Sequence, residues 1–364
     1  MARKAKRTGR YPYEPDYAVP PGATLQETIE AQGIDQKELA RRTGFTEKHV
    51  SQVINGKAAI SADSAIRFER VTGVPAGFWN NLESQYREQR ARLDATEQLE
   101  SDLGWLKRVP VKEMVQRGIL PELRDRKDIL DRVLRFFGVA SVAAWHEGWS
   151  QPQFAFRKSQ AVAQQDEAMA VWLRLGEIEA QRVVCRPYDA KRFRANLERI
   201  RALTMCSPEE FVPQMVELCA EAGVAVVLVR EIKGAPVSGA TKWLTPQRAM
   251  ICLSLRGKAN DRFWFTFFHE AGHILKDKKG EVFVDVDDGS NPRERAANEF
   301  AARILIPAPH DAELGGLRSR VAVEAFAKRI GVHPGIVVGR LQRDGILPYT
   351  HLNRLKAKFS WAKE

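Results

Sequence analysis

The stretch "FWFTFFHEAGHIL", residues 263–275, places two histidines and a glutamate inside an aromatic run that is otherwise typical of a buried helix. In a helix, residues four apart lie on the same face, so His269 and His273 can direct both imidazoles at one point. This geometry suits a tetrahedral metal such as zinc. The pattern therefore predicts a metal-binding helix. The alternative is that both histidines are hydrogen-bonded core residues.

Glu270 follows the first histidine and is predicted to act as a general base. A carboxylate beside a metal-bound water can take a proton while that water attacks a carbonyl group. The surrounding aromatic residues are expected to anchor the helix and to lower the local dielectric. The HExxH spacing thus predicts hydrolytic chemistry.

A third metal ligand is expected in the segment "NPRERAANEFAARILIP", residues 291–307. Pro292 is typical of the first position of a helix, and Glu294 and Asn298 then lie four residues apart on one face. Glu294 is predicted to complete a two-histidine, one-glutamate site, and Asn298 to orient a ligating imidazole. Two alternatives remain: Glu294 forms a capping box with Asn291, or Glu299 is the ligand.

The segments around this motif predict an α+β fold that is mostly helical. Short runs of β-branched and apolar residues, bounded by Gly, Pro or charged residues, predict four strands of a small sheet within residues 224–232, 237–243, 249–255 and 281–287. Helical patterns cover residues 166–183 and 189–203. The run at 249–255 is interpreted as an edge strand that could bind an extended peptide.

The segment "DQKELARRTGFTEKHVSQVINGK", residues 35–57, has the pattern of a helix-turn-helix. Asp35 is a predicted N-cap, and Gly44 can adopt the left-handed backbone that the turn requires. Val50 and Val53 are expected to face the core. The alternative is a small helical bundle that contacts proteins.

The second helix of this motif is predicted to enter the major groove of DNA. The residues expected to contact DNA are Gln36, Thr46, Lys48, His49, Ser51, Gln52 and Asn55.

Composition supports a globular protein with a polyanionic partner. The chain has 364 residues, a net charge of +11 and 28% charged residues. A basic surface gains affinity for nucleic acid by releasing counterions. The N-terminus lacks the apolar stretch of a signal peptide, and no apolar run reaches the length of a membrane span, so a cytoplasmic location without membrane contact is expected.

Residues 22–93, including the continuation "ISADSAIRFERVTGVPAGFWNNLESQYREQRARL", resemble the Xre-type repressor domain and most closely the HigA-type antitoxins. This resemblance implies a homodimer that binds a palindromic, double-stranded DNA operator.

Residues 150–350 resemble the ImmA/IrrE family of zinc metallo-endopeptidases. The motifs that carry the resemblance are "WFTFFHEAGHIL", "ERAANEFAARILIP" and "IGVHPGIVVGRLQRDGIL". The resemblance implies a thermolysin-like minimal core, zinc on His269, His273 and Glu294, Glu270 as the general base, and cleavage of a repressor protein in a stress or mobile-element response. One departure is "HILKDKKG", since many relatives carry another histidine after the helix. His333 and Arg340, in the third motif, are candidates for the lining of the cleft.

The predicted organisation is a basic arm (1–20), a helix-turn-helix domain (21–93), a helical linker (94–149), a metallopeptidase domain (150–350) and a C-terminal tail (351–364). The predicted function is a DNA-binding transcriptional regulator with zinc-dependent endopeptidase activity. The alternative is a repressor or antitoxin whose metallopeptidase fold is a non-catalytic sensor or partner-binding module.

Overall fold

The computed structural model describes residues 17–149, 166–277, 282–284 and 292–362. Most of the predicted arm therefore lies outside the described residues. The chain divides into two compact units, Met1–Leu103 and Gly104–Glu364. Among the described helices, none combines the length and the apolar character needed to cross a bilayer.

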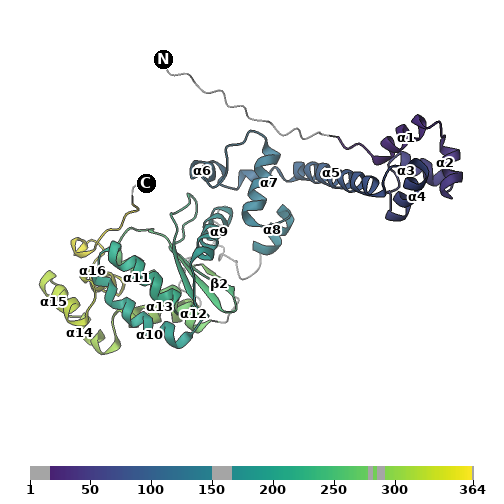
Figure 1. Cartoon of the computed structure of the whole chain (residues 1–364). Helices are drawn as coiled ribbons and strands as arrows, with labels where there is room; N and C mark the ends of the chain where they lie inside the picture. Colours follow the sequence, from purple (N-terminus) through teal and green to yellow (C-terminus); the bar gives the residue numbers. More distant parts are fainter. Residues whose placement is uncertain (1–16, 150–165, 278–281, 285–291, 363–364) are drawn as a thin grey trace, which may run out of the picture. The chain divides into compact units, whose positions relative to one another are not determined.

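The first unit is a bundle of five helices (Figure 1). These are α1 (Pro21–Ala31), α2 (Gln36–Thr43), α3 (Glu47–Ile54), α4 (Ala62–Thr72) and α5 (Ala76–Asp102). The core side chains come from all five helices and include Leu25, Leu39, Val50, Val53, Phe68 and Trp79, each at most 1% exposed. The bundle thus closes around the face of α3 that carries the two valines predicted to be buried.

Local signals in the sequence place the turn between α2 and α3. The Asp35 carboxylate accepts a hydrogen bond from the backbone N–H of Glu38 at 2.7 Å and caps α2. Gly44 ends this helix with φ of 74°, a left-handed conformation that favours glycine. Thr46 then caps α3. The predicted helix-turn-helix is confirmed.

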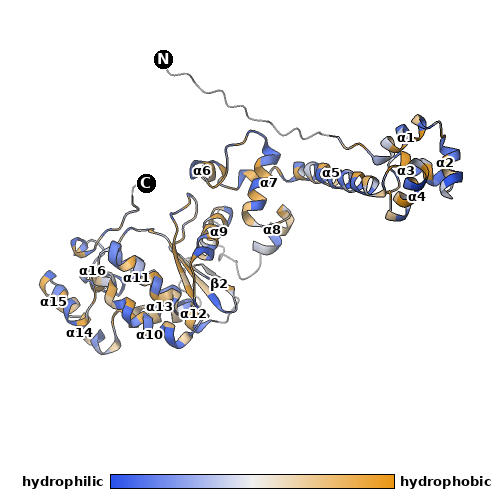
Figure 2. Cartoon of the chain, in the orientation of Figure 1, coloured by the Kyte–Doolittle hydropathy of each residue, from blue (hydrophilic) through white to orange (hydrophobic). Residues whose placement is uncertain are grey.

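Helix α5 continues past residue 93, where the sequence predicted the end of the first domain. No Gly or Pro interrupts the chain between residues 78 and 102, so nothing local stops the helix. Figure 2 shows this helix as mostly hydrophilic. The boundary between the two compact units in the sequence falls between Leu103 and Gly104.

The second unit is built on a four-stranded sheet with strand order β1-β3-β2-β4. The strands are β1 (Val224–Leu228), β2 (Gly239–Thr245), β3 (Arg248–Leu253) and β4 (Val282–Val284). Strand β3 pairs in parallel with β1 and antiparallel with β2, which pairs antiparallel with β4. The predicted strands are confirmed over the residues that the structure describes, which leave out 281 and 285–287 of the fourth. The interpretation of residues 249–255 as an edge is wrong, because β3 is hydrogen-bonded on both sides.

This unit also contains the following longer helices. They are α6 (Val111–Gln116), α7 (Arg126–Phe137), α8 (Val142–Trp149), α9 (Asp166–Arg182), α10 (Ala190–Ala202), α11 (Pro208–Ala220), α12 (Asn260–Lys276), α13 (Pro292–Leu305), α15 (Arg320–Ile330) and α16 (Pro334–Arg343). Shorter turns are η1 (Trp105–Lys107), η3 (Leu203–Met205), η4 (Ala308–His310), α14 (Asp311–Leu314) and η5 (Asn353–Leu355). The fold is α+β and mostly helical, as predicted.

Alternation along β2 assigns α9 and α12 to opposite faces of the sheet. Thr241 donates a hydrogen bond to Glu270 of α12, whereas the next residue, Lys242, pairs with Glu177 of α9. Successive side chains of a strand point to opposite faces. The sheet is therefore covered on both sides, and α12 lies on the face that includes the larger part of the apolar core.

Residues 104–149, the greater part of the segment 94–149 predicted to be a helical linker, pack onto α9 within the second unit. The indole of Trp105 donates to the buried Glu167 carboxylate at 3.2 Å, and Arg174 donates to the carbonyl of Phe136 at 2.9 Å. Trp105 also contacts Phe137 and Trp145. These contacts join residues tens of positions apart, which is why the local pattern did not reveal them.

The predicted C-terminal tail runs back along the start of α12. The backbone N–H of Asn260 donates to the carbonyl of Ala357 at 2.9 Å, and the N–H of Phe359 donates to that of Lys258 at 2.7 Å. Lys356 forms a salt bridge with Asp261 at 2.6 Å. Residues 351–362 of the tail are therefore part of the second unit.

Candidate functional site

The central part of α12 holds both histidines inside the protein. Trp264, Phe267 and Phe268 are fully buried around it, while His269 and His273 are each 2% exposed. The two imidazole Nε2 atoms lie 3.0 Å apart. The helix spacing and the aromatic anchors thus bring both rings to one point, as the sequence predicted.

Glu294 of α13 reaches the same point. One carboxylate oxygen lies 3.1 Å from His269 Nε2, and the other lies 3.5 Å from His273 Nε2. Potential ligand atoms of the three residues all lie within 4.8 Å of one another. Two imidazole nitrogens and a carboxylate form a donor set that fits zinc.

Small residues allow α13 to approach α12 closely. A Cβ atom at Gly272 would lie 3.3 Å from the Cα atom of Ala297 and 3.1 Å from the ring of Phe300. Glu299, the alternative ligand, is 66% exposed and faces Arg303 instead. Asn291, the partner in the alternative capping box, lies outside the described residues. Glu294 is thus the glutamate of α13 that joins the histidines.

A hydrogen-bond acceptor supports each imidazole from behind. Asn298 Oδ1 lies 3.0 Å from His269 Nδ1, where it accepts the Nδ1 proton. Asp277 Oδ2 lies 2.6 Å from His273 Nδ1 and accepts in the same way. Such acceptors fix the ring and leave Nε2 available as a ligand atom. Asp277 was not among the predicted site residues, although it lies four positions after His273.

The charges of the triad are strongly coupled. Burial lowers the pKa of His273, but hydrogen bonds to Asp277 and Glu294 outweigh it and raise this pKa to about 10. Burial raises the pKa of Glu294, but hydrogen bonds from His269 and His273 outweigh it and lower this pKa to about 2. The carboxylates beside His273 therefore favour positive charge on its ring, and a metal bound at Nε2 would replace the proton there.

Glu270 is fully buried beside the triad. The Thr241 hydroxyl of β2 donates a 2.6 Å hydrogen bond to its Oε2 atom. At Gly239, an added Cβ atom would lie 2.8 Å from Glu270 Oε1 and 2.5 Å from Thr266. Strand β2 thus approaches α12 where glycine leaves room for the carboxylate. Thr241 and Glu270 are 29 residues apart in the sequence, so no local pattern predicts that they form a hydrogen bond.

The two predicted cleft residues have local partners in the structure. The ring of His333 accepts from the backbone N–H of Gly335 at 3.0 Å and caps α16, and burial lowers its pKa. Arg340 pairs with Asp344 at 2.6 Å and with Asp311 at 3.3 Å. None of these bonds involves a residue of the triad.

The residues expected to contact DNA lie on or beside α3. Lys48 is exposed and Gln52 is partly buried, on the side away from Val50 and Val53. Thr46 accepts a hydrogen bond from the N–H of His49 at 3.1 Å, and Asn55 donates to the carbonyl of Ser51 at 2.7 Å. The exposed part of α3 thus carries polar groups, the cation of Lys48 and the carboxylate of Glu47.

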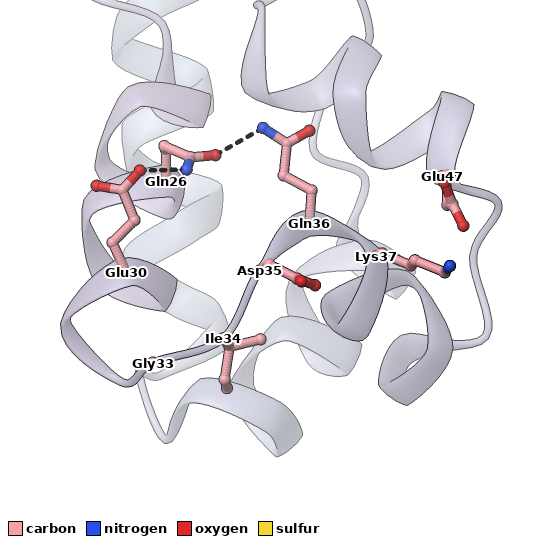
Figure 3. Close-up of a pocket in the computed structure, with 8 residues that line it drawn as sticks. All are labelled: Gln26, Glu30, Gly33, Ile34, Asp35, Gln36, Lys37 and Glu47. Atoms are coloured by element: carbon pink, nitrogen blue, oxygen red, sulfur yellow. Dashed lines mark hydrogen bonds between the residues drawn. The ribbon is translucent and has the colours of Figure 1, made fainter.

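Gln36 lies apart from α3, at the start of α2. Its amide donates to Gln26 of α1 at 2.9 Å across a shallow polar hollow (Figure 3). The remaining lining residues of this hollow are Glu30, Gly33, Ile34, Asp35, Lys37 and Glu47. The acidic side chains of this hollow do not favour a phosphate beside Gln36.

Comparisons with known proteins match one segment in each unit. Residues 25–79 match the family model described as a helix-turn-helix, and residues 222–342 match the one described as an IrrE N-terminal-like domain. No curated protein matches the chain.

Two solved structures are similar to part of the chain. An addiction module antidote protein of a HigA family from Coxiella burnetii is 26% identical over 23% of this chain and 92% of that chain, with a TM-score of 0.22. The Pseudomonas aeruginosa antitoxin HigA, solved with the higBA promoter, is 31% identical over 23% of this chain and 94% of that chain, with a TM-score of 0.22. By the two family-model matches, the chain joins a helix-turn-helix domain to an IrrE N-terminal-like domain of a peptidase family.

Proposed function

We propose that this protein is a DNA-binding transcriptional regulator whose second unit is a zinc-dependent endopeptidase. The observation that carries the proposal is the convergence of His269, His273 and Glu294 beside the buried Glu270. The match to a peptidase-family domain supports it. We propose a repressor protein as the substrate and a homodimer as the DNA-binding form.

Each residue of the site has a separate task in this proposal. His269, His273 and Glu294 would hold zinc, which would supply Lewis-acid activation of water and of the scissile carbonyl. Glu270 takes the proton from the attacking water and passes it to the leaving amine. Thr241 keeps the carboxylate of Glu270 in place through its 2.6 Å hydrogen bond.

The direct test of the proposal is cleavage of a repressor. The purified, zinc-loaded chain is incubated with repressors encoded near its gene, and the products are separated on gels and identified by mass spectrometry. We expect one or a few discrete cleavage sites, and a zinc chelator should stop the reaction. Absence of any fragment, with zinc bound and with every candidate signal tried, would instead favour the non-catalytic sensor.

Asp277 gives a prediction about metal affinity. Replacing Asp277 with alanine removes the acceptor that orients His273, and zinc affinity should fall by about ten- to a hundredfold. Asp277→Asn retains an acceptor like that of Asn298 and should lose less affinity. The measurement is competition with a chromophoric chelator, with the exposed Asp311→Ala as the control. Unchanged affinity in Asp277→Ala would contradict the role of this carboxylate.

The first unit gives a prediction about DNA. Replacing Gln52 with alanine should remove a contact to a base edge and cost about 1–3 kcal/mol of discrimination, whereas Lys48→Ala should weaken binding or base preference. Operator fragments are first selected from genomic DNA, and binding to operator and scrambled duplexes is then compared. Gln98→Ala, on the exposed side of α5, is the matched control. Equal affinity of the wild-type chain for every duplex would contradict sequence-specific recognition.

A further inference from the structure

The positive charge of the protein does not lie in the unit that carries the helix-turn-helix. Residues 17–103 contain 10 Lys and Arg but 13 Asp and Glu, and residues 1–16 contain 5 against 2. Residues 104–364 contain 42 Lys and Arg against 31 Asp and Glu. The attraction to a polyanion that the net charge of +11 predicted must therefore come largely from the second unit.

Four strongly exposed arginines of the second unit are paired with a carboxylate of their own helix. Arg135, Arg182, Arg303 and Arg320 are 70%, 71%, 72% and 70% exposed, and each faces a carboxylate three or four residues away. Such pairs present little net charge to a partner. These four arginines therefore serve as controls for exposed cations that have no carboxylate partner.

Four exposed cations gather where the C-terminal tail meets the start of α12. They are Arg256, Lys258, Arg262 and Lys358, and we refer to them as the basic surface. An antiparallel bridge joins Ala259 to Lys358, and the hydrogen bond from Phe359 to Lys258 extends this pairing. The side chain of Arg262 lies over Gly257, 2.8 Å from where a Cβ atom would be. Two segments almost a hundred residues apart thus form one surface.

No carboxylate within salt-bridge distance faces these four cations among the residues that the structure describes. The only acidic residue within 254–262 and 353–359 is Asp261, which is 9% exposed and pairs with Lys356. Arg256 donates to the backbone carbonyl of Pro236, which carries no net charge. The basic surface therefore presents four uncompensated charges, unlike the ion-paired arginines.

We propose that the basic surface binds the phosphate backbone of DNA without sequence preference. This inference rests on the proposed DNA binding of the first unit. Once that unit is on DNA, the second unit is held at a high effective concentration, so individually weak phosphate contacts add to affinity. Lys and Arg bound to phosphates release condensed counterions, which makes their contribution steeply dependent on salt. A cluster of four cations binds best to a partner with closely spaced negative charges. Duplex DNA carries such charges along its whole backbone, whereas a protein surface carries charges of both signs.

The test uses the full chain and a 40-base-pair duplex of random sequence, a length chosen to be about four helical turns. In one variant, all four cations of the basic surface are changed to glutamine. In the control variant, the changes to glutamine are at Arg135, Arg182, Arg303 and Arg320. Both variants lose the same formal charge. Circular dichroism and zinc content verify that each variant folds.

The expected result is a flatter dependence of log affinity on log salt concentration. Each lost phosphate contact reduces the slope by about 0.9, so loss of at least two contacts should reduce it by about 1.8 or more in the basic-surface variant alone. Equal slopes for the two variants and the wild-type chain would overturn the proposal. If the slopes are equal and the basic-surface variant instead binds a protein substrate more weakly, the proposal is overturned as well. If the wild-type chain binds no duplex even at low salt, the proposed DNA binding fails as well.

Discussion

Replacing Glu270 with glutamine should leave zinc bound and the fold intact but reduce peptide hydrolysis at least about a hundredfold. The reason is that the amide has nearly the shape of the carboxylate but cannot accept the proton of the attacking water. The loss of a positioned general base typically costs about a hundred- to ten-thousandfold in rate. Glu270 is fully buried, and a glutamine side chain of nearly the same shape should fit into the same space.

The assay for this variant is the rate of repressor cleavage at equal zinc content. The exposed Glu299 of α13 provides a matched control, since Glu299→Gln makes the same chemical change on a neighbouring helix. A second comparison separates position from chemistry: Thr241→Ser retains the hydroxyl that holds Glu270, whereas Thr241→Val removes it. Cleavage by Glu270→Gln at the wild-type rate would remove Glu270 from the mechanism.

Replacing His269 or Glu294 with alanine should remove most of the zinc from the purified protein. Each residue supplies one of the three protein ligands, and the remaining two cannot complete the coordination of a tight zinc site. The potential ligand atoms lie within 4.8 Å of one another, so no rearrangement of the helices is needed to bind a metal. Loss of zinc is also expected to abolish hydrolysis.

Elemental analysis after dialysis measures the metal content of each variant. His351→Ala and Glu299→Ala, which change an exposed histidine and an exposed glutamate outside the triad, should retain one zinc per chain. Thermal unfolding with and without added zinc provides a further readout, because a ligand that binds only the folded state raises its stability. Full zinc content in both His269→Ala and Glu294→Ala would place the metal elsewhere.

The sequence by itself determined the features that depend on residues a few positions apart. Asp35, Gly44 and Thr46 act on their own helix ends, so the cap and turn rules located the helix-turn-helix. The four-residue spacing of His269 and His273 brings their rings together in any α-helix. The same rule, extended by one turn, would also have found Asp277.

The tertiary structure alone decided which distant segments meet. Strand β3 is central because both β1 and β2 pair with it, and no local pattern distinguishes a central strand from an edge. Thr241 meets Glu270, and Lys358 meets the start of α12, through packing between segments that the sequence separates by dozens of residues. The net charge likewise did not show where on the protein the positive charges lie. The binding of a polyanion depends on the positions of the cations in space, and the fold gathers cations without a carboxylate partner at the C-terminal tail.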